Sequence, residues 1–142
     1  MRYVVDTNII NWLVDGTIEL EALPDDGEII ATHIQVDELN NTPDRERRAQ
    51  LFLKFAAVVD VVVPTESMVI GLSRIELSKV GEGGFYLSVK DMLDKKRKKP
   101  NNAQDALIAE VAIKYNYVLL TADSDLSEVA RDHGGIVRHF VH

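Results

Sequence analysis

The stretch VVDTNII, residues 4–10, places Asp6 between two valines and two isoleucines. Central strands of parallel sheets are buried on both faces, and the apolar run before Asp6 is typical of such a strand. We expect a strand over residues 2–5 and a helix over residues 7–14 that ends before Gly16. A carboxylate between two apolar segments is costly to bury unless another group pairs with it. The question is therefore which partners the rest of the chain supplies.

The remaining sequence alternates short β-rich runs with helical stretches. Further strands are expected at residues 28–31, 58–63, 117–121 and 136–140. Helices are expected at residues 34–40, 43–57, 65–79 (with Thr65 as N-cap), 85–99, 101–115 (capped by Asn101 or Asn102) and 126–132, with a glycine-rich loop at 81–84. This alternation predicts a single α/β domain over residues 1–142, a three-layer sandwich in which helices cover both faces of a mainly parallel sheet.

The composition excludes several classes of protein. The chain has no cysteine, so a disulfide framework and a zinc–thiolate site are impossible. No apolar stretch reaches the roughly 18–20 residues of a membrane span, and the N-terminus lacks a signal pattern, so we expect no membrane association and a cytoplasmic location. The net charge of −7 argues against a protein that coats nucleic acid electrostatically. One basic block nevertheless stands out, formed by Lys95, Lys96, Arg97, Lys98 and Lys99.

Acidic residues follow two of the expected strands. Asp6 comes directly after the first strand, and Asp123, with Asp125 close behind, comes after the fourth. Either position alone would more often be a helix N-cap. However, ligands of open α/β sheets bind at the carboxyl ends of the strands, so two acids at this edge suggest a shared cation.

A third acid lies on the expected core-facing side of a helix. Projected at 100° per residue, residues 101–115 place Asp105 opposite the polar side. The core-facing side holds Asp105, Ile108, Ala109 and Ala112, and the other side holds Ala103, Glu110 and Lys114. A carboxylate near the centre of a buried face is unexpected, although it could also cap a neighbouring helix or pair with an arginine.

A fourth candidate lies in ATHIQVDELNN, after the second strand, where Asp37 and Glu38 are adjacent. Periodicity does not decide which of them points inward, and a surface role is the simpler interpretation for either alone. Several carboxylates gathered at one edge raise one another's pKa. A Mg²⁺ or Mn²⁺ ion would compensate their charge, and such an ion can activate water for attack on a phosphodiester.

Four segments occur in order along nearly the whole chain: VVDTNII, VDEL, QDALIAEVA and LLTADSDL. With them the chain resembles the PIN domain family, the fold of many metal-dependent ribonucleases, and most closely the short VapC-type toxins. The resemblance implies the strand order 3-2-1-4-5, an RNA substrate and a Mg²⁺ or Mn²⁺ cofactor. It also implies frequent homodimerisation and, for toxins, an antitoxin protein that blocks the site.

The resemblance also assigns roles to residues of this chain. The acidic metal site that it implies consists of Asp6, Glu38, Asp105 and Asp123. It favours Glu38 over Asp37 because the family's glutamate directly precedes a leucine, here Leu39. The remaining matches are a second acid of the last motif, Asp125, and three small polar residues that hydrogen-bond the acids or the ligand, Thr7, Asn8 and Thr121. Leu126 departs from the pattern, since the family commonly has phenylalanine there.

The leading hypothesis is a metal-dependent endoribonuclease, the toxin of a toxin–antitoxin pair. The alternatives are a PIN-fold RNA-processing nuclease outside such systems and a PIN-fold binding module without catalysis, which the intact set of acids disfavours. An aspartyl phosphatase would want a second acid at Asn8, and a phosphoacceptor receiver would want an aspartate ending the third strand. The basic block either holds RNA phosphates or complements the dipole at a helix C-terminus on a solvated face.

Overall fold

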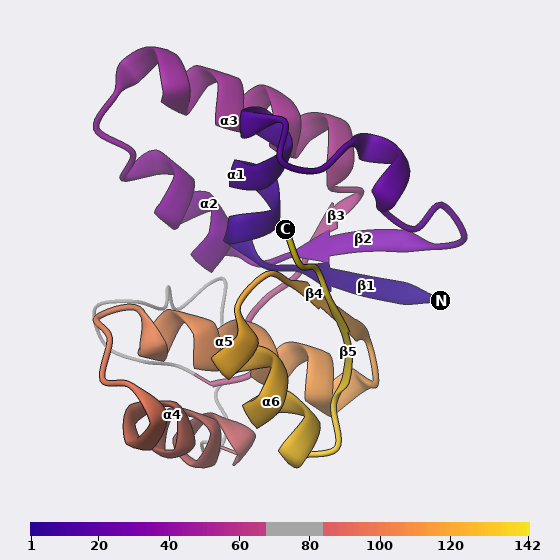
Figure 1. The fold of residues 1–142 in the computed structure, drawn as a ribbon. Helices are drawn as coiled ribbons and strands as arrows, with labels where there is room; N and C mark the ends of the chain where they lie inside the picture. Colours follow the sequence, from indigo (N-terminus) through magenta and orange to yellow (C-terminus); the bar gives the residue numbers. More distant parts are fainter. Residues whose placement is uncertain (68–83) are drawn as a thin grey trace.

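The protein, represented by a computed structural model that describes residues 1–67 and 84–142, is built on a five-stranded sheet. The strand order is β3-β2-β1-β4-β5, and each neighbouring pair is parallel (Figure 1). The strands are β1 (Arg2–Val5), β2 (Glu28–Ala31), β3 (Val61–Val62), β4 (Val118–Thr121) and β5 (Ile136–His139). The predicted α/β class and strand order are therefore confirmed.

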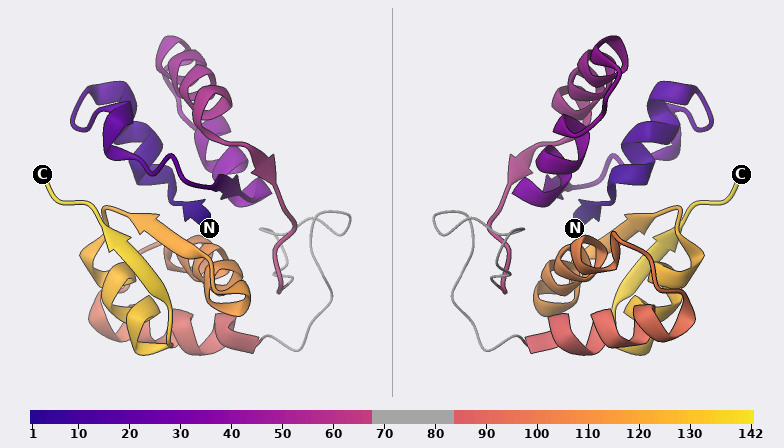
Figure 2. Two further views of the ribbon diagram at one scale, coloured as in Figure 1. Left: turned by 90° about the vertical axis from the view of Figure 1, so that its right-hand side faces the viewer. Right: turned by 90° about the vertical axis from the view of Figure 1, so that its left-hand side faces the viewer.

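Helices cover both faces of the sheet, as predicted. α1, α2 and α3 lie on one side, and α4, α5 and α6 lie on the other (Figures 1 and 2). The bounds are α1 (Thr7–Asp15), a 3₁₀ turn η1 (Leu20–Ala22), α2 (His33–Asn40), α3 (Arg45–Val58), α4 (Gly84–Lys96), α5 (Asn102–Tyr115) and α6 (Ser124–Asp132). No helix in the described ranges has the length and apolar character needed to cross a membrane.

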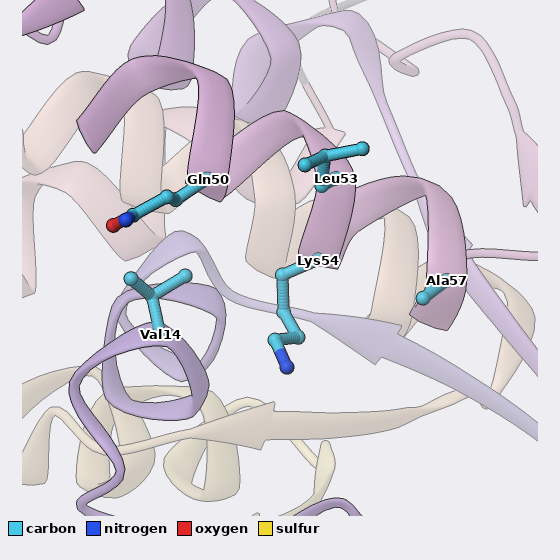
Figure 3. Close-up of a pocket in the computed structure, with 5 residues that line it drawn as sticks. All are labelled: Val14, Gln50, Leu53, Lys54 and Ala57. Atoms are coloured by element: carbon cyan, nitrogen blue, oxygen red, sulfur yellow. The ribbon is translucent and has the colours of Figure 1, made fainter. Parts of the chain in front are cut away.

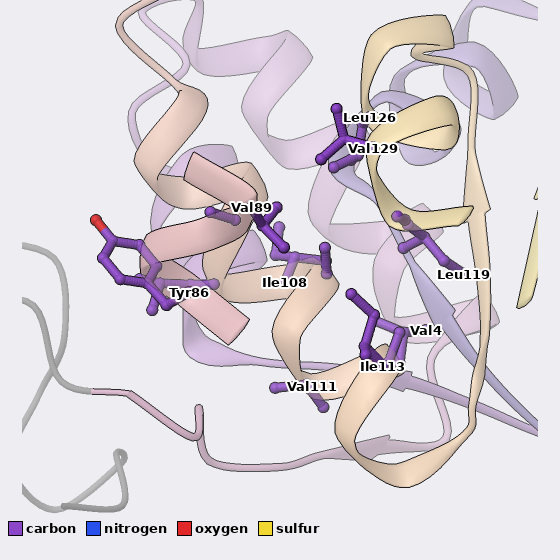
Figure 4. Close-up of a cluster of buried hydrophobic side chains, with 14 of the residues drawn as sticks. Val4, Tyr86, Val89, Ile108, Val111, Ile113, Leu119, Leu126 and Val129 are labelled. Carbon is purple, nitrogen blue, oxygen red and sulfur yellow. The ribbon is translucent and has the colours of Figure 1, made fainter. Parts of the chain in front are cut away.

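Two hydrophobic clusters, one on each face, hold the layers together. In β1, Val4 packs with α4, α5 and α6, whereas Tyr3 and Val5 pack with α1 and α3. In β4, Leu119 joins the first cluster and Leu120 the second (Figure 4 shows the first). Successive side chains of a strand point to opposite faces, so these central strands are apolar at every position. Asp6 and Asp123 follow these two buried strands, so the packing of the strands also fixes the positions of the two carboxylates.

The third strand is shorter than predicted. Val58 belongs to the last turn of α3, and the amide of Val59 donates to the carbonyl of Phe55 at 2.8 Å. Only Val61 and Val62 pair with β2. A continuous apolar run has no periodicity that separates the end of a helix from the start of a strand. The prediction therefore assigned Val58, the last residue of the helix, to the strand over residues 58–63.

The helix that carries the basic block is also shorter than predicted. It ends at Lys96 rather than Lys99. Pro100 disfavours the α region at Lys99, which agrees with an end before that residue. Asn102, predicted as a possible cap of the next helix, instead donates to the carbonyl of Arg97 at 2.9 Å. The predicted helix over residues 65–79 is not formed at residues 65–67, which have a bridge and bends instead. The rest of that helix and most of the predicted loop over residues 81–84 lie outside the described residues.

α5 is covered on more sides than its sequence pattern suggested. Glu110, predicted on the outer side, is only 2% exposed because α4 packs over it. Its Oε2 accepts a hydrogen bond from the amide of Tyr86, in the first turn of α4, at 2.8 Å. The projection was wrong here since it assumed one covered face, whereas α5 lies between the sheet and α4. Asp105 is buried, as the projection predicted.

Candidate active site

A cavity of about 190 Å³ opens at the carboxyl ends of β1 and β4. The described residues that line it come from the start of α1, from α2, from the start of α5 and from the end of β4. They are Asp6, Thr7, Asn8, Asn11, Glu38, Asn101, Asp105 and Asp123. The fold thus gathers four carboxylates that lie up to 117 residues apart in the sequence, between Asp6 and Asp123.

Asp6 is held by the backbone and by one hydroxyl. Its Oδ1 accepts from the amide of Thr7 at 2.8 Å, so it is also the N-cap of α1. Its Oδ2 accepts from the hydroxyl of Thr121 at 2.7 Å, and the same hydroxyl accepts from the amide of Asp123 at 3.0 Å. Burial raises the pKa of Asp6 to about 6, although these hydrogen bonds oppose the rise. The carboxylate of Asp6 therefore serves both as the N-cap of α1 and as part of the candidate site.

Asp123 is likewise a helix cap. Its Oδ1 accepts from the amides of Asp125 and Leu126 at 2.9 and 3.2 Å, at the start of α6. Its Oδ2 accepts from the ammonium of Lys99 at 3.2 Å. Both oxygens of this carboxylate therefore have partners within the protein.

Glu38 reaches the cavity because α2 is fastened to the end of β1. The side-chain amide of Gln35 donates to the carbonyl of Val5 at 2.9 Å. Glu38 lies one turn further along the same face of α2, and its Oε1 accepts from the hydroxyl of Thr7 at 2.9 Å. Burial, and then the charge of Asp6, raise the pKa of Glu38 to about 7.

Asp105 has the most strongly perturbed pKa of the four acids. It is 4% exposed, in the first turn of α5, and among the described residues its one side-chain hydrogen bond comes from the amide of Asn101 at 3.4 Å. Burial, and then the charges of the other three acids, raise its pKa to about 9. Within the described residues it neither pairs with an arginine nor caps a neighbouring helix, the alternatives that its sequence position left open.

Two predicted or candidate acids are not among the described residues that line the cavity. Asp125 points to the basic block, with its Oδ2 3.9 Å from Nε of Arg97. Asp37 is adjacent to Glu38 but does not line the cavity. The geometry thus agrees with the preference for Glu38 that the family resemblance implied.

The polar lining includes residues that the sequence alone did not single out for the site. Asn8 was predicted, and its Oδ1 accepts from the amide of Ala122 at 3.2 Å, which joins α1 to the end of β4. Asn11 was missed, although it lies four residues after Thr7 on the same face of α1, a spacing that could have revealed it. Asn101 was considered only as a helix cap, yet its side chain points to an acid of the site.

Three cations of the basic block lie against acids of α6 or its N-cap. The pairs are Lys96 with Glu128 at 2.7 Å, Arg97 with Asp125 at 3.9 Å and Lys99 with Asp123 at 3.2 Å. The block is therefore neither a bare phosphate-binding surface nor a simple solvated face. Its C-terminal end contacts the acidic cavity directly, a contact that no spacing in the sequence signals.

The four carboxylates provide the oxygen donors that hard divalent cations prefer. Within residues 1–67 and 84–142, however, no three acidic, histidine or cysteine side chains already form a geometric metal site. To bind one ion together, these side chains would therefore have to move from their present positions. The raised pKa values of Asp105 and Glu38 have the same physical origin, since buried carboxylates without a counter-charge hold protons.

A second cavity, of about 360 Å³, lies between α1 and α3 (Figure 3). It is larger than the acidic cavity, but the described part of its lining offers no carboxylate, histidine or hydroxyl. The described lining residues are Val14, Gln50, Leu53, Lys54 and Ala57. This mixture of apolar side chains with one amide and one ammonium brings together no acid–base or metal-binding group, so the acidic cavity is the candidate active site.

Comparison with known proteins assigns the chain to a family. The family model for the PIN domain matches residues 3–132, so the chain belongs to the PIN domain family, as the sequence resemblance predicted. PIN domains are generally nucleases. No curated protein matches the sequence.

Solved structures share this fold over nearly the full length. VapBC2 from Rickettsia felis, bound to a DNA fragment from its promoter, is 19% identical, with 99% of both chains covered and a TM-score of 0.63. VapBC-1 from nontypeable Haemophilus influenzae is 22% identical, with 98% of both chains covered and a TM-score of 0.61. VapBC-5 from Mycobacterium tuberculosis, of a toxin–antitoxin family, is 18% identical with a TM-score of 0.55, covering 99% of this chain and 98% of its own. At these identities the similarity establishes the fold.

Proposed function

We propose that this protein is a divalent-metal-dependent endoribonuclease. The observation that carries the proposal is the group of four acids around one cavity, in which Asp105 is buried without a cationic partner and has a pKa of about 9. A buried carboxylate without a cationic partner lowers the stability of the fold, and a bound cation would offset this cost. Strongly perturbed pKa values also concentrate at functional sites. Membership of a family of nucleases supports the same reaction class.

Asp6, Glu38, Asp105 and Asp123 are the residues that would hold Mg²⁺ or Mn²⁺. The donor set fits, because all four are carboxylates and the chain has no cysteine to favour a softer metal. When bound, the metal would activate water and stabilise charge on the phosphodiester. Thr121 and Thr7 orient the acids through hydrogen bonds of 2.7 Å to Asp6 and 2.9 Å to Glu38.

The cations beside the cavity are suited to an RNA backbone. Lys95 and Lys98 are exposed, and Lys99 stands at the cavity itself. Lys96 and Arg97 also belong to the block, but acids of α6 already neutralise part of their positive charge. Neutralising phosphates beside the acids would offset the repulsion between the acidic site and its substrate.

The likeness to VapBC structures supports a role as the toxin of a toxin–antitoxin pair, with an antitoxin protein as partner. A role in RNA processing outside such a pair is the alternative. Homodimerisation, a cytoplasmic location and a single domain over residues 1–142 stay predictions. Expression in a bacterial host separates the two roles: a toxin should arrest growth, and co-expression of the product of an adjacent upstream frame should relieve the arrest.

The nuclease proposal is tested with purified protein and a labelled single-stranded RNA. Cleavage is expected with Mn²⁺ or Mg²⁺ and should stop when EDTA is added. Asp6→Asn and Glu38→Gln should abolish cleavage, whereas Asp37→Asn, which changes the acid next to Glu38, should retain it. RNA binding or partner binding without cleavage by the wild-type chain would instead identify a non-catalytic PIN-fold module.

A further inference from the structure

Lys99 is the cation that contacts the acidic cavity. Its Nζ lies 3.2 Å from Oδ2 of Asp123, and the two side chains are only 28% and 18% exposed. Among the described residues this is the one ion pair made by any of the four carboxylates. Lys99 reaches the cavity because α4 ends at Lys96, which leaves residues 97–99 as a non-helical segment beside the start of α6.

The contact occupies the atom that a metal would need. Oδ1 of Asp123 already accepts two amide hydrogen bonds at the start of α6, from Asp125 and Leu126. Losing them would uncap the helix, so Oδ2 is the oxygen free to bind a ligand. Lys99 holds that oxygen. An ammonium and a divalent cation repel each other and compete for the same oxygen.

We propose that Lys99 is an internal competitor of the divalent cation: it neutralises Asp123 in the metal-free protein and leaves this carboxylate when a metal binds. The inference rests on the proposed function, because it takes these four acids as the metal site. Lys99 is a positioning residue here. A lysine suits this role because its ammonium is a compact charge on a flexible stem, which can swing away without unfolding the segment that carries it.

The charge of Lys99 also reaches beyond Asp123. It lowers the pKa of Asp105, against the larger effects of burial and of the other acids. Removing this charge should therefore favour any cation that enters the cavity. Lys99 weakens metal binding in two ways, by competing for Oδ2 and by repelling the metal through space. Replacing Lys99 with a neutral residue should therefore increase the metal affinity, whichever of the two effects is larger.

The test is the Mn²⁺ affinity of the purified chain, measured by isothermal titration calorimetry. Lys99→Met keeps the length of the side chain and removes the charge, and should lower the Kd about three- to tenfold, as expected for loss of a partly buried ion pair. Lys99→Arg keeps the charge and should stay within about twofold of the wild type. Lys95→Met, an exposed lysine of the same basic block, is the matched control and should also stay within about twofold.

A second readout excludes a merely structural role. Without metal, Lys99→Met should melt at or below the wild-type temperature, because Asp123 has lost its partner. With saturating Mn²⁺ its gain in Tm should exceed that of the wild type. An unchanged or weaker Kd in Lys99→Met, or equal tightening in Lys95→Met or Lys99→Arg, would overturn the inference. Absence of Mn²⁺ binding by the wild-type chain would overturn the proposed metal site together with it.

Discussion

The four acids of the cavity form two pairs that differ in their hydrogen bonds. The strand-end acids, Asp6 and Asp123, follow β1 and β4 and accept hydrogen bonds from the first amides of α1 and α6. The helix acids, Glu38 and Asp105, project from α2 and α5, and within the described part of the chain each accepts one side-chain hydrogen bond, at 2.9 and 3.4 Å. The pKa is raised to about 6 for Asp6, about 7 for Glu38 and about 9 for Asp105.

The difference separates what the fold needs from what the proposed function needs. A parallel strand followed by a helix offers a place for a capping acid, and such an acid stabilises the helix whether or not a ligand binds. Asp105 stabilises nothing comparable, since burial and neighbouring charges oppose its ionisation. The helix acids therefore carry the stronger functional signal, although both pairs would be needed to hold a metal.

The largest expected effect is on catalysis, where the two pairs should behave alike. Asp105→Asn and Asp123→Asn should each lower the rate of Mn²⁺-dependent RNA cleavage by more than about 100-fold, because each removes a ligand that the metal would need. The measurement is initial cleavage rate at saturating Mn²⁺. If one pair could be replaced with little loss, the metal would be held by the other pair alone.

Stability without metal should separate the pairs. Asp105→Asn should raise the free energy of unfolding in EDTA by about 1–3 kcal/mol, because it removes a buried group that resists ionisation. Asp123→Asn should lower it by up to about 1 kcal/mol, since asparagine still caps α6 but loses the ion pair with Lys99. Urea unfolding at pH 7 measures both. A loss of stability in Asp105→Asn would show that this carboxylate has a stabilising partner.

The pH dependence of the metal-free protein should follow the raised pKa values. A carboxyl whose pKa is higher in the folded state binds its proton more tightly there, so stability falls as the pH rises from the unfolded value toward the folded one. For Asp6, Glu38 and Asp105 this window runs from about pH 4 to about pH 9.

Thermal melts in EDTA should therefore give a Tm several degrees higher at pH 5.5 than at pH 8.5. Asp105→Asn serves as the control and should flatten the upper part of this dependence, because Asp105 has the highest folded pKa of the three. Saturating Mn²⁺ should flatten or reverse the slope in the wild type, since the metal replaces the protons. A wild-type Tm that rises with pH in EDTA would contradict the raised pKa values.

The positions of the strand-end acids and of the helix acids could be predicted from the sequence to different extents. Asp6 and Asp123 follow apolar strands, and the sheet order inferred from the family resemblance is enough to bring them together. Asp105 was identified as buried because helical periodicity fixes the direction of a side chain. Glu38 could not be distinguished from Asp37 by periodicity, since the direction of α2 depends on the hydrogen bond from Gln35 to the carbonyl of Val5.

What the sequence did not predict depends on contacts between distant segments. Burial of Glu110 requires α4 to lie over α5, and a projection of one helix contains no information about a second covering layer. The contact between Lys99 and Asp123 depends on where α4 ends. Pro100 signals that this helix must stop but not that the following residues turn toward the acids.

The last comparison concerns the hydroxyls behind each pair. Thr121 is fully buried and bonds both strand-end acids, donating to Asp6 and accepting from the amide of Asp123. Thr7 donates to Glu38 alone. Thr121→Val should therefore lower the free energy of unfolding by about 1–3 kcal/mol, because it leaves a partly buried amide and a buried carboxylate oxygen unpaired. Thr7→Val should cost about 0.5–1 kcal/mol, since Glu38 is less buried.

Urea unfolding of the two valine variants, in EDTA and in Mn²⁺, makes this comparison with side chains of matched shape. The Mn²⁺ affinity should also fall further in Thr121→Val, because this hydroxyl orients the oxygen of Asp6 and the backbone of Asp123 together. Equal losses in the two variants would mean that the strand-end acids keep their orientation through the helix caps alone. In that case the hydroxyl of Thr121 would only satisfy buried groups, and the difference between the pairs would lie in the acids themselves.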